Sequence, residues 1–197
     1  LAFSLFAVGA ANIKGEAGDE IMPPATSPID DYPGQDIDQA WPFFGRDLKN
    51  THSSSADTSH LDGTLKWDHS TGSMITYSSP AVGGNGVVYV GNLDTELHAI
   101  NSDGTGRWVY QDNNSIYNGV YSSPSLDGQG NIYFGTRQDK LVSLHPNGTL
   151  RWTFESGGAF DSSPVVADDG TVYIGSGDKK LYALDENGSE EWSFETG

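Results

Sequence analysis

The sequence predicts an all-β protein built from a repeated four-stranded antiparallel sheet. Three segments align without gaps: SSPAVGGNGVVYVGNLDTELHAINSDGTGRW from Ser78, SSPSLDGQGNIYFGTRQDKLVSLHPNGTLRW from Ser122 and SSPVVADDGTVYIGSGDKKLYALDENGSEEW from Ser162. Each holds short β-branched or aromatic runs at the same offsets, separated by Asn-Gly or Asp-Gly pairs that favour turns. No segment repeats apolar residues at the spacing of an amphipathic helix, which excludes helical repeats.

The spacing inside each repeat is constant, and only the connections vary. The interval from proline to tryptophan is 28 residues in every copy: Pro80 to Trp108, Pro124 to Trp152 and Pro164 to Trp192. The repeats are therefore rigid units joined by connections of adjustable length. One four-stranded sheet cannot bury both of its faces, so the units must stack, as the blades of a β-propeller do.

Each element of a repeat has its own signal. In the first copy, β-branched and aromatic residues predict strands at 81–82, 87–90, 97–100 and 107–110. Asn85-Gly86 and Asp103-Gly104 lie between them, and their tolerance of positive φ predicts two-residue hairpin turns. Four antiparallel strands per repeat follow from this order.

The repeat resembles a known family. The pattern SSP-x-V, [VI]-Y-[VIF]-G, L-x-[AS]-[IL] and [DN]-G-x-x-x-W is similar to the quinoprotein-type, or PQQ-like, β-propeller repeat, and the similarity covers residues 41–197. The stretch from Ala183 to Trp192 resembles the tryptophan-docking motif of that family, in which the indole stacks against the next blade. The resemblance implies a ring of about seven or eight blades.

A tryptophan recurs in the fourth strand of the repeat. These residues are Trp67, Trp108, Trp152 and Trp192. A wide flat ring at the same place in every copy indicates structural packing between blades, whereas stacking on a ligand needs a tryptophan in one loop only. Trp67 belongs to an expected last strand at 65–69 without its first three partners. We therefore expect three full blades and one orphan strand, a fragment of a larger ring; the alternative is an open arc that closes by self-association.

The N-terminal segments differ in composition from the repeats. Residues 1–11 are apolar and end in small residues, which is typical of the hydrophobic region of a secretory signal peptide whose basic start is missing. A short buried strand or helix is the alternative, and the run is too short to span a bilayer. Residues 12–40 are rich in proline and acidic residues and predict an extended linker before the repeats of 41–197. We expect a secreted, periplasmic or cell-surface protein.

Composition excludes several kinds of partner and site. The chain of 197 residues has no cysteine, and its 10 Lys and Arg against 27 Asp and Glu give a formal net charge of -17. Such a surface repels a nucleic-acid backbone and anionic lipid headgroups. The absence of cysteine excludes disulfides, thiolate metal sites and cysteine nucleophiles.

No motif for catalysis or metal binding stands out. The five histidines share no spacing, and no GxSxG, HExxH or phosphate-binding glycine loop occurs. Ser78 and Ser79 recur in each copy, which indicates hydrogen bonds from hydroxyl to backbone. Three groups of oxygen ligands lack the spacing of a calcium loop: Asn92-Asp94-Glu96, Asp112-Asn113-Asn114 and Asp168-Asp169.

The resemblance leaves two functions open. The resemblance to the quinone-dependent dehydrogenases implies a site in which PQQ stacks on a tryptophan beside a calcium ion. In the alcohol dehydrogenases, adjacent cysteines also belong to this site. No position of this chain matches a catalytic residue of that family, so we expect no catalytic residue, cofactor or metal here. Other relatives are scaffolds without cofactor, such as the propeller lipoprotein of the outer-membrane assembly machinery. We expect a scaffold that binds a protein or surface ligand; the alternative is a fragment of a PQQ-dependent dehydrogenase whose quinone and calcium site lies outside this chain.

The candidate binding site is the connection from Gln111 to Tyr121, the longest between blades. Long connections on a rigid scaffold commonly carry binding function. Tyrosine supplies flat contact area and asparagine supplies adaptable hydrogen bonds. Tyr77 and Asp161 precede the first strands of the other two blades, at the position that Tyr121 occupies before its own. We therefore expect a ligand-binding face near the ring axis, formed by Tyr77, Asn113, Asn114, Tyr117, Asn118, Tyr121 and Asp161. The alternative is a surface insertion without function.

Overall fold

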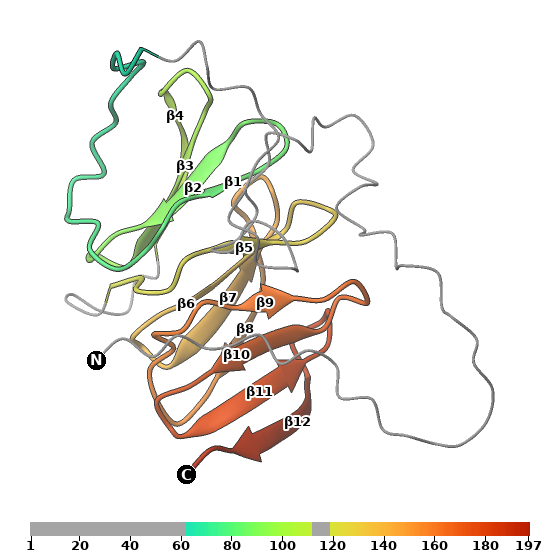
Figure 1. Ribbon diagram of the computed structural model, residues 1–197. Coiled ribbons are helices and arrows are strands. Elements are labelled where there is room, and N and C mark those ends of the chain that lie inside the picture. Colours follow the sequence, from blue (N-terminus) through green and yellow to red (C-terminus); the bar gives the residue numbers. More distant parts are fainter. Residues whose placement is uncertain (1–61, 112–118) are drawn as a thin grey trace.

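The structure, a computed structural model, describes residues 62–111 and 119–197 (Figure 1). The signal segment expected at 1–11 and the linker expected at 12–40 lie outside the described residues. Within 62–111 and 119–197 no helix is long and apolar enough to cross a membrane.

The strands form three four-stranded antiparallel sheets, each in sequence order. Blade 1 consists of β1 (Ala81–Val82), β2 (Val88–Gly91), β3 (Glu96–Ile100) and β4 (Gly106–Gln111). Blade 2 consists of β5 (Ser125–Leu126), β6 (Ile132–Gly135), β7 (Lys140–Leu144) and β8 (Leu150–Glu155). Blade 3 consists of β9 (Val165–Val166), β10 (Val172–Gly175), β11 (Lys180–Leu184) and β12 (Glu190–Glu195). The predicted all-β fold of four-stranded blades is confirmed.

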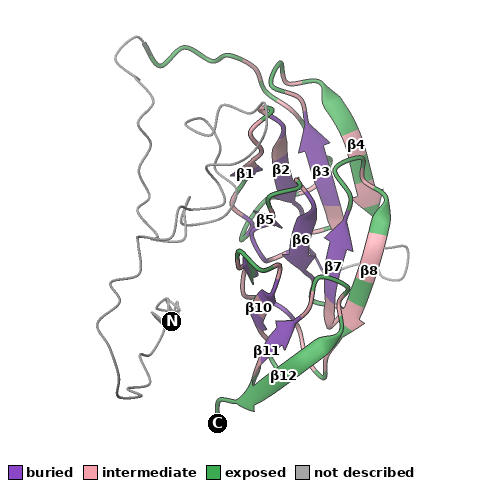
Figure 2. Ribbon diagram, turned by 90° about the vertical axis from the view of Figure 1, so that its right-hand side faces the viewer, coloured by how far each residue is buried: buried purple, intermediate pink, exposed green. Residues whose placement is uncertain are grey.

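The blades stack face to face, and the core lies between them. Figure 1 shows the order from blade 1 to blade 3, and Figure 2 shows β4, β8 and β12 along the exposed outer edge with buried strands behind them. Between blades 1 and 2, Tyr89 and Leu97 of one sheet join Phe134 of the next in one cluster. Between blades 2 and 3, Leu141 and Ile174 belong to a second cluster. Successive side chains of a strand point to opposite faces, so blade 2 contributes to both clusters.

The β3–β4 turns are longer than the two-residue hairpins that the sequence predicts, and that prediction is wrong. In blade 1 the Gly104 N–H donates to the Asn101 carbonyl, and the Asn101 N–H donates to the Thr105 carbonyl. Gly104 has a φ of 87°, while Asp103 is not in the positive-φ region. The Asp103 carboxylate instead accepts a hydrogen bond from the Thr105 N–H at 2.9 Å. Only the glycine needs a left-handed conformation, because the aspartate side chain caps the amide that follows.

Each turn glycine supports a tryptophan of the preceding blade. Trp108 lies so close to Gly148 that a Cβ added there would be 2.7 Å from Cδ2 of the indole, and Gly148 has a φ of +85°. The Trp108 Nε1–H donates to the Pro146 carbonyl at 3.1 Å. Trp152 repeats the contact on Gly188 and donates to the Glu186 carbonyl at 2.8 Å. Any side chain at these glycines would displace the indole, so tryptophan and glycine form one docking unit.

Trp67 and Trp192, the first and last of the four recurring tryptophans, differ in what they contact. Residues 65–69 form no strand, since no described strand lies beside them to supply hydrogen bonds, which differs from the orphan strand expected there. Trp67 nevertheless lies on Gly104 and donates to the Ser102 carbonyl at 3.0 Å. Trp192 in β12 faces no further turn among the described residues and is 45% exposed. The other three indoles are half-buried.

The paired serines connect the inner ends of the blades. The Ser122 hydroxyl accepts from the Gly135 N–H at 2.7 Å and donates to the Gly135 carbonyl at 3.0 Å. The Ser79 N–H donates to the Ser123 hydroxyl, and the Ser123 N–H donates to the Ser163 hydroxyl, both at 2.9 Å. The first serine of each pair therefore holds its own blade, and the second joins one blade to the next. Their role is structural, as their recurrence indicates.

The docking unit predicts unequal costs for removing equivalent tryptophans. We expect Trp152→Ala to reduce the free energy of unfolding by about 3 kcal/mol, the lower end of the range for aromatic truncation, because the indole is half-buried. Trp192→Ala is the matched control, and its exposed position predicts a loss of about 1 kcal/mol or less. Urea denaturation of both variants measures the difference, and equal losses would contradict the docking role of Trp152.

Candidate functional site

The blade topology divides the loops between two ends of the stack. Because neighbouring strands are antiparallel, the β1–β2 and β3–β4 turns share the end at which the tryptophans dock. The opposite end, called the loop face below, consists of the β2–β3 turns and the segments that lead into the first strands. Its residues are 71–80, 92–95, 119–124, 136–139, 156–164 and 176–179.

The end of the long connection is anchored to two blades. The Val120 N–H donates to the Asn92 carbonyl of blade 1 at 2.8 Å, and the Arg137 N–H of blade 2 donates to the Gly119 carbonyl at 3.3 Å. Val120 is buried against Gly91, where an added Cβ would lie 2.4 Å from its Cγ1. The backbone that presents Tyr121 is therefore fixed by hydrogen bonds and packing.

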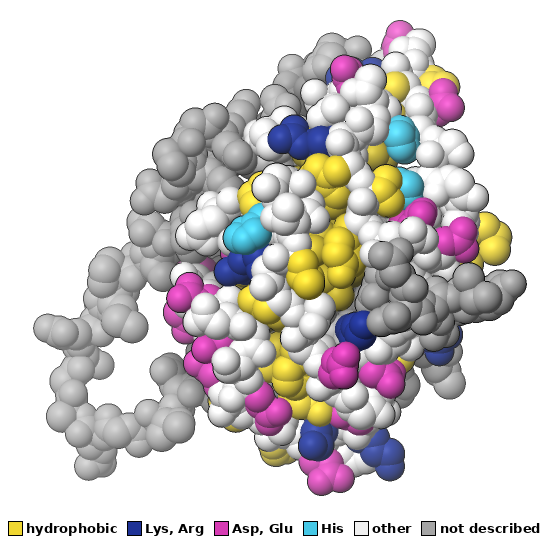
Figure 3. Space-filling view, turned by 180° about the vertical axis from the view of Figure 1, so that it is seen from behind, with side chains coloured by type: hydrophobic (Ala, Val, Ile, Leu, Met, Phe, Trp, Pro, Cys, Tyr) yellow, Lys and Arg dark blue, Asp and Glu magenta, His cyan; other side chains and the backbone are white. Residues whose placement is uncertain are grey.

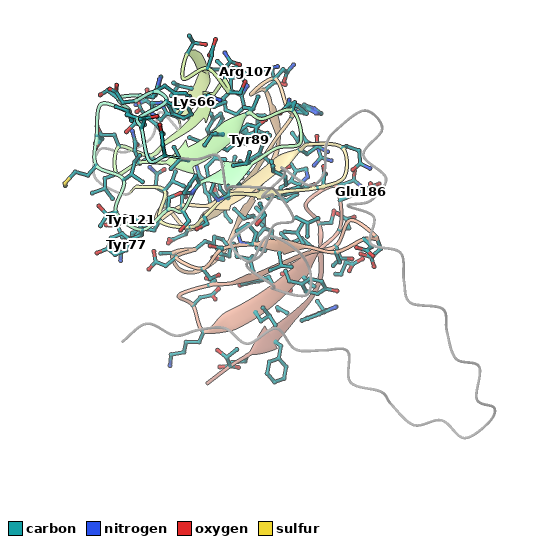
Figure 4. All side chains as sticks on the ribbon, turned by 45° about the horizontal axis from the view of Figure 1, so that its top comes forward. Lys66, Tyr77, Tyr89, Arg107, Tyr121 and Glu186 are labelled. Carbon is teal, nitrogen blue, oxygen red and sulfur yellow. The ribbon has the colours of Figure 1, made fainter. Side chains whose placement is uncertain are left out.

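Four side chains from three blades form a continuous row on this face, the tyrosine–arginine row. The rings of Tyr77 and Tyr121 stack with centroids 4.4 Å apart and an interplanar angle of 25°. The Arg137 guanidinium carbon lies 4.7 Å from the Tyr121 ring centroid. The Arg137 Nε lies 3.3 Å from Oδ1 of Asp161. Figure 4 shows Tyr77 and Tyr121 together, away from Lys66, Arg107 and Glu186 at other parts of the molecule.

The row is charged and accessible to solvent. The Arg137 and Asp161 side chains are 45% and 54% exposed. Contact with the Tyr121 side chain, and then the negative charge of Asp161, raise the pKa of Arg137 above its ordinary value. An ion pair this exposed contributes little to folding. The guanidinium thus stays charged at every physiological pH and remains within reach of a ligand.

Three of the expected ligand-binding residues lie close together. Tyr77, Tyr121 and Asp161 were expected on one face, and Arg137 connects Tyr121 to Asp161 in the structure; their role in ligand binding stays a prediction. The other expected ligand-binding residues, Asn113, Asn114, Tyr117 and Asn118, lie outside the described residues.

Arg137 was missed by the sequence analysis, although the repeat alignment held a signal for it. Arg137 occupies the position at which the other blades have Leu93 and Gly177. The turn is otherwise regular, and it lies beside the longest connection. A charged residue at its variable position was therefore a signal for Arg137.

The junction between blades 2 and 3 is built differently. The Ser156 and Ser176 hydroxyls lie 2.9 Å apart, and the Gly157 N–H donates to Asp178 Oδ2 at 3.1 Å. The same carboxylate accepts from the Tyr182 hydroxyl, and burial together with this hydrogen bond raises the pKa of Tyr182 to about 12. Short polar side chains therefore fill the junction of blades 2 and 3. In the described part of the chain, the stack of Tyr77 on Tyr121 occurs only at the junction of blades 1 and 2.

The described residues contain no cluster of acidic side chains that could hold calcium. No group of three or more His, Asp or Glu side chains in the described ranges could hold a metal ion. In the Asn92-Asp94-Glu96 group, the Asn92 side-chain oxygen accepts from the Asp94 and Glu96 amides at 3.0 and 3.1 Å. The Asn92 amide nitrogen donates to Glu96 Oε2 at 2.7 Å, and that oxygen also lies 3.0 Å from His98 Nε2. These groups bond to one another and form no cage for a cation.

Comparisons with known proteins give a family match and a shared fold. Residues 114–197 match the profile of a family described as outer membrane protein assembly factor BamB. No curated protein sequence matches the chain.

Three solved structures show the extent of the structural similarity. BamB from Moraxella catarrhalis is 22% identical, with a TM-score of 0.57 over 68% of this chain and 40% of that one. Quinohemoprotein alcohol dehydrogenase from Comamonas testosteroni is 20% identical, with a TM-score of 0.64 over 79% and 27% of the two chains. A europium-containing methanol dehydrogenase is 19% identical, with a TM-score of 0.66 over 80% and 32%.

The chain spans less than half the length of each of these structures. Identities this low show a common fold, and all three structures share it. Together with the docking of tryptophan on glycine, they show that the three blades have the fold of β-propeller blades, and blades 2 and 3 lie in the part of the chain that matches the family profile.

Proposed function

We propose that these blades act as a non-catalytic scaffold that binds a protein or surface ligand through the loop face. The observation that carries the proposal is the tyrosine–arginine row, in which Tyr77 and Arg137 are exposed and the half-buried Tyr121 contacts both. Tyrosine and arginine are the side chains most enriched at binding hot spots, along with tryptophan.

The rigidity of the row favours binding. A ligand that meets loose side chains must order them, which costs free energy that a preorganised surface does not lose. Here Tyr121 contacts both Tyr77 and Arg137, and Arg137 is paired with Asp161. The four side chains are already in one arrangement before a ligand arrives.

The family match supports a protein partner and a location outside the cytoplasm. Residues 114–197 resemble an outer-membrane protein assembly factor, and a factor of that kind works on other proteins. The apolar segment 1–11 has the composition of a secretory signal. We therefore place the scaffold in the periplasm, at the cell surface or outside the cell, with no nucleic-acid partner.

A PQQ-dependent dehydrogenase is the second candidate. It is favoured by the two dehydrogenase structures, whose TM-scores of 0.64 and 0.66 exceed the 0.57 of BamB. The described residues do not supply its ligand set, so any quinone and calcium would be held by other parts of the protein. The scaffold is the better-supported function for these blades.

The scaffold proposal predicts that binding depends on the loop face and stability does not. Replacing residues 113–118 by a short Gly-Ser turn, or Arg137→Ala, is expected to remove the partner recovered when the full chain is cross-linked in an extract of its source organism. The melting temperature should change by less than about 2 °C, because surface substitutions rarely shift stability by more than about 0.5 kcal/mol.

Val109→Ala is the matched control for that experiment, since Val109 is 53% exposed on β4 and lies outside the loop face. It should retain the partner. If both loop-face variants retain the partner at unchanged stability, the loop face has no role in binding.

The scaffold proposal also predicts that the purified chain binds neither PQQ nor calcium with useful affinity. The expected result is no quinone absorbance after incubation with PQQ and removal of unbound cofactor, and no change in melting temperature on adding calcium. Ligand binding to the native state would raise that temperature by mass action. A quinone spectrum retained by the protein, or a calcium-dependent rise, would favour the dehydrogenase.

A further inference from the structure

The stack of the tyrosine–arginine row is open at one end. Tyr77 and the Arg137 guanidinium both contact the Tyr121 ring: the Tyr77 centroid lies 4.4 Å and the guanidinium carbon 4.7 Å from the Tyr121 centroid. Tyr77 is 61% exposed, and stacking on Tyr121 occupies one face of its ring. No other ring or cation of residues 62–111 and 119–197 stacks on Tyr77, so within the described residues its other face is open.

The chemistry of the open face selects a cation. The face of a tyrosine ring carries negative quadrupole charge, and an arginine guanidinium is the cation most often found above such rings. The chain already uses this contact once, between Arg137 and Tyr121. The planar guanidinium also stacks and is less strongly hydrated than a lysine ammonium, so arginine is the better match.

The charges around Tyr77 favour the same occupant. The chain has a formal net charge of -17, which attracts a basic partner at a distance. Asp94 is exposed in the 92–95 turn, and that turn is bonded to the segment of Tyr77 through the Leu93 N–H and the Met74 carbonyl at 3.0 Å. The one cation of the row, Arg137, is paired with Asp161. On the face seen from behind, Figure 3 shows acidic side chains on both sides of a hydrophobic band, so negative charge is not confined to one part of the surface.

We infer that the open face of Tyr77 receives the guanidinium of an arginine from a basic segment of the protein partner. This inference rests on the proposed function and specifies its partner. The arginine becomes the second guanidinium in contact with this pair of tyrosine rings, and the net negative charge of the chain favours it. A lysine, a neutral planar group or an aromatic ring on Tyr77 are the competing occupants.

The test uses three peptides that differ only in the stacking group: acetyl-Gly-Arg-Gly-Arg-Gly-amide and its lysine and citrulline counterparts. Titrated into the full chain by calorimetry or NMR, the arginine peptide should bind most tightly, and added salt should weaken its binding. Citrulline keeps the planar shape without the charge and should not bind measurably. Equal binding of the arginine and lysine peptides, or of the arginine and citrulline peptides, would overturn the inference.

Three variants locate the contact. Tyr77→Ala should weaken the arginine peptide by about fivefold, the factor that corresponds to an exposed cation–π contact. Tyr77→Phe should retain the affinity because the ring remains. Phe194→Ala is the matched control, since Phe194 is 64% exposed on β12, and it should have no effect. If Phe194→Ala weakens binding as much as Tyr77→Ala, the peptide binds non-specifically to acidic and aromatic surfaces, and the inference of a site at Tyr77 is wrong.

The outcome for the natural partner separates this inference from the proposed function. A partner that is lost when residues 113–118 are replaced but retained by Tyr77→Ala supports the loop face and overturns the arginine contact. A partner retained by every loop-face variant overturns both. Circular dichroism of each variant confirms that the sheets are intact.

Discussion

The contact between a tryptophan of one blade and a turn glycine of the next is the interaction on which the rest of the structure depends. Two requirements meet at Gly148, a backbone φ of +85° and an indole where a Cβ would be. The hydrogen bond from Trp108 to the Pro146 carbonyl then fixes the orientation of the ring. Because the same unit recurs at Gly104 and Gly188, successive blades meet in the same way.

Docking at one end of the blades leaves the length of the connections at the other end free to vary. The serine pairs hold the inner ends of the sheets, and the tryptophans hold the turns opposite the loop face. Neither contact involves the long connection from Gln111 to Tyr121. A connection of different length can therefore be accommodated without disturbing the blades. The tyrosine–arginine row is built where this freedom is greatest, at the junction of blades 1 and 2.

The repeat pattern was sufficient to predict the blades, because constant spacing and β-type composition are local properties that stacking reinforces. It also placed Tyr77, Tyr121 and Asp161 on one face, since equivalent positions of stacked repeats lie at the same end. Arg137 was not predicted, because its partners come from two other segments and only the three-dimensional packing brings them together. The turn type was missed because the Asp103 side chain caps Thr105, an interaction that the Asp-Gly pair alone does not reveal.

The central claim is that Trp108 and Gly148 act as one unit, and a double-mutant cycle of Trp108→Ala and Gly148→Ala tests it most directly. Unfolding in urea gives the four free energies. With Trp108 present, Gly148→Ala should be costly, because the added Cβ strains the backbone and displaces the indole. With Trp108 removed, only the strain of about 1–2 kcal/mol should remain, so the two substitutions couple. An equal cost of Gly148→Ala in both backgrounds would show that the indole does not depend on the glycine.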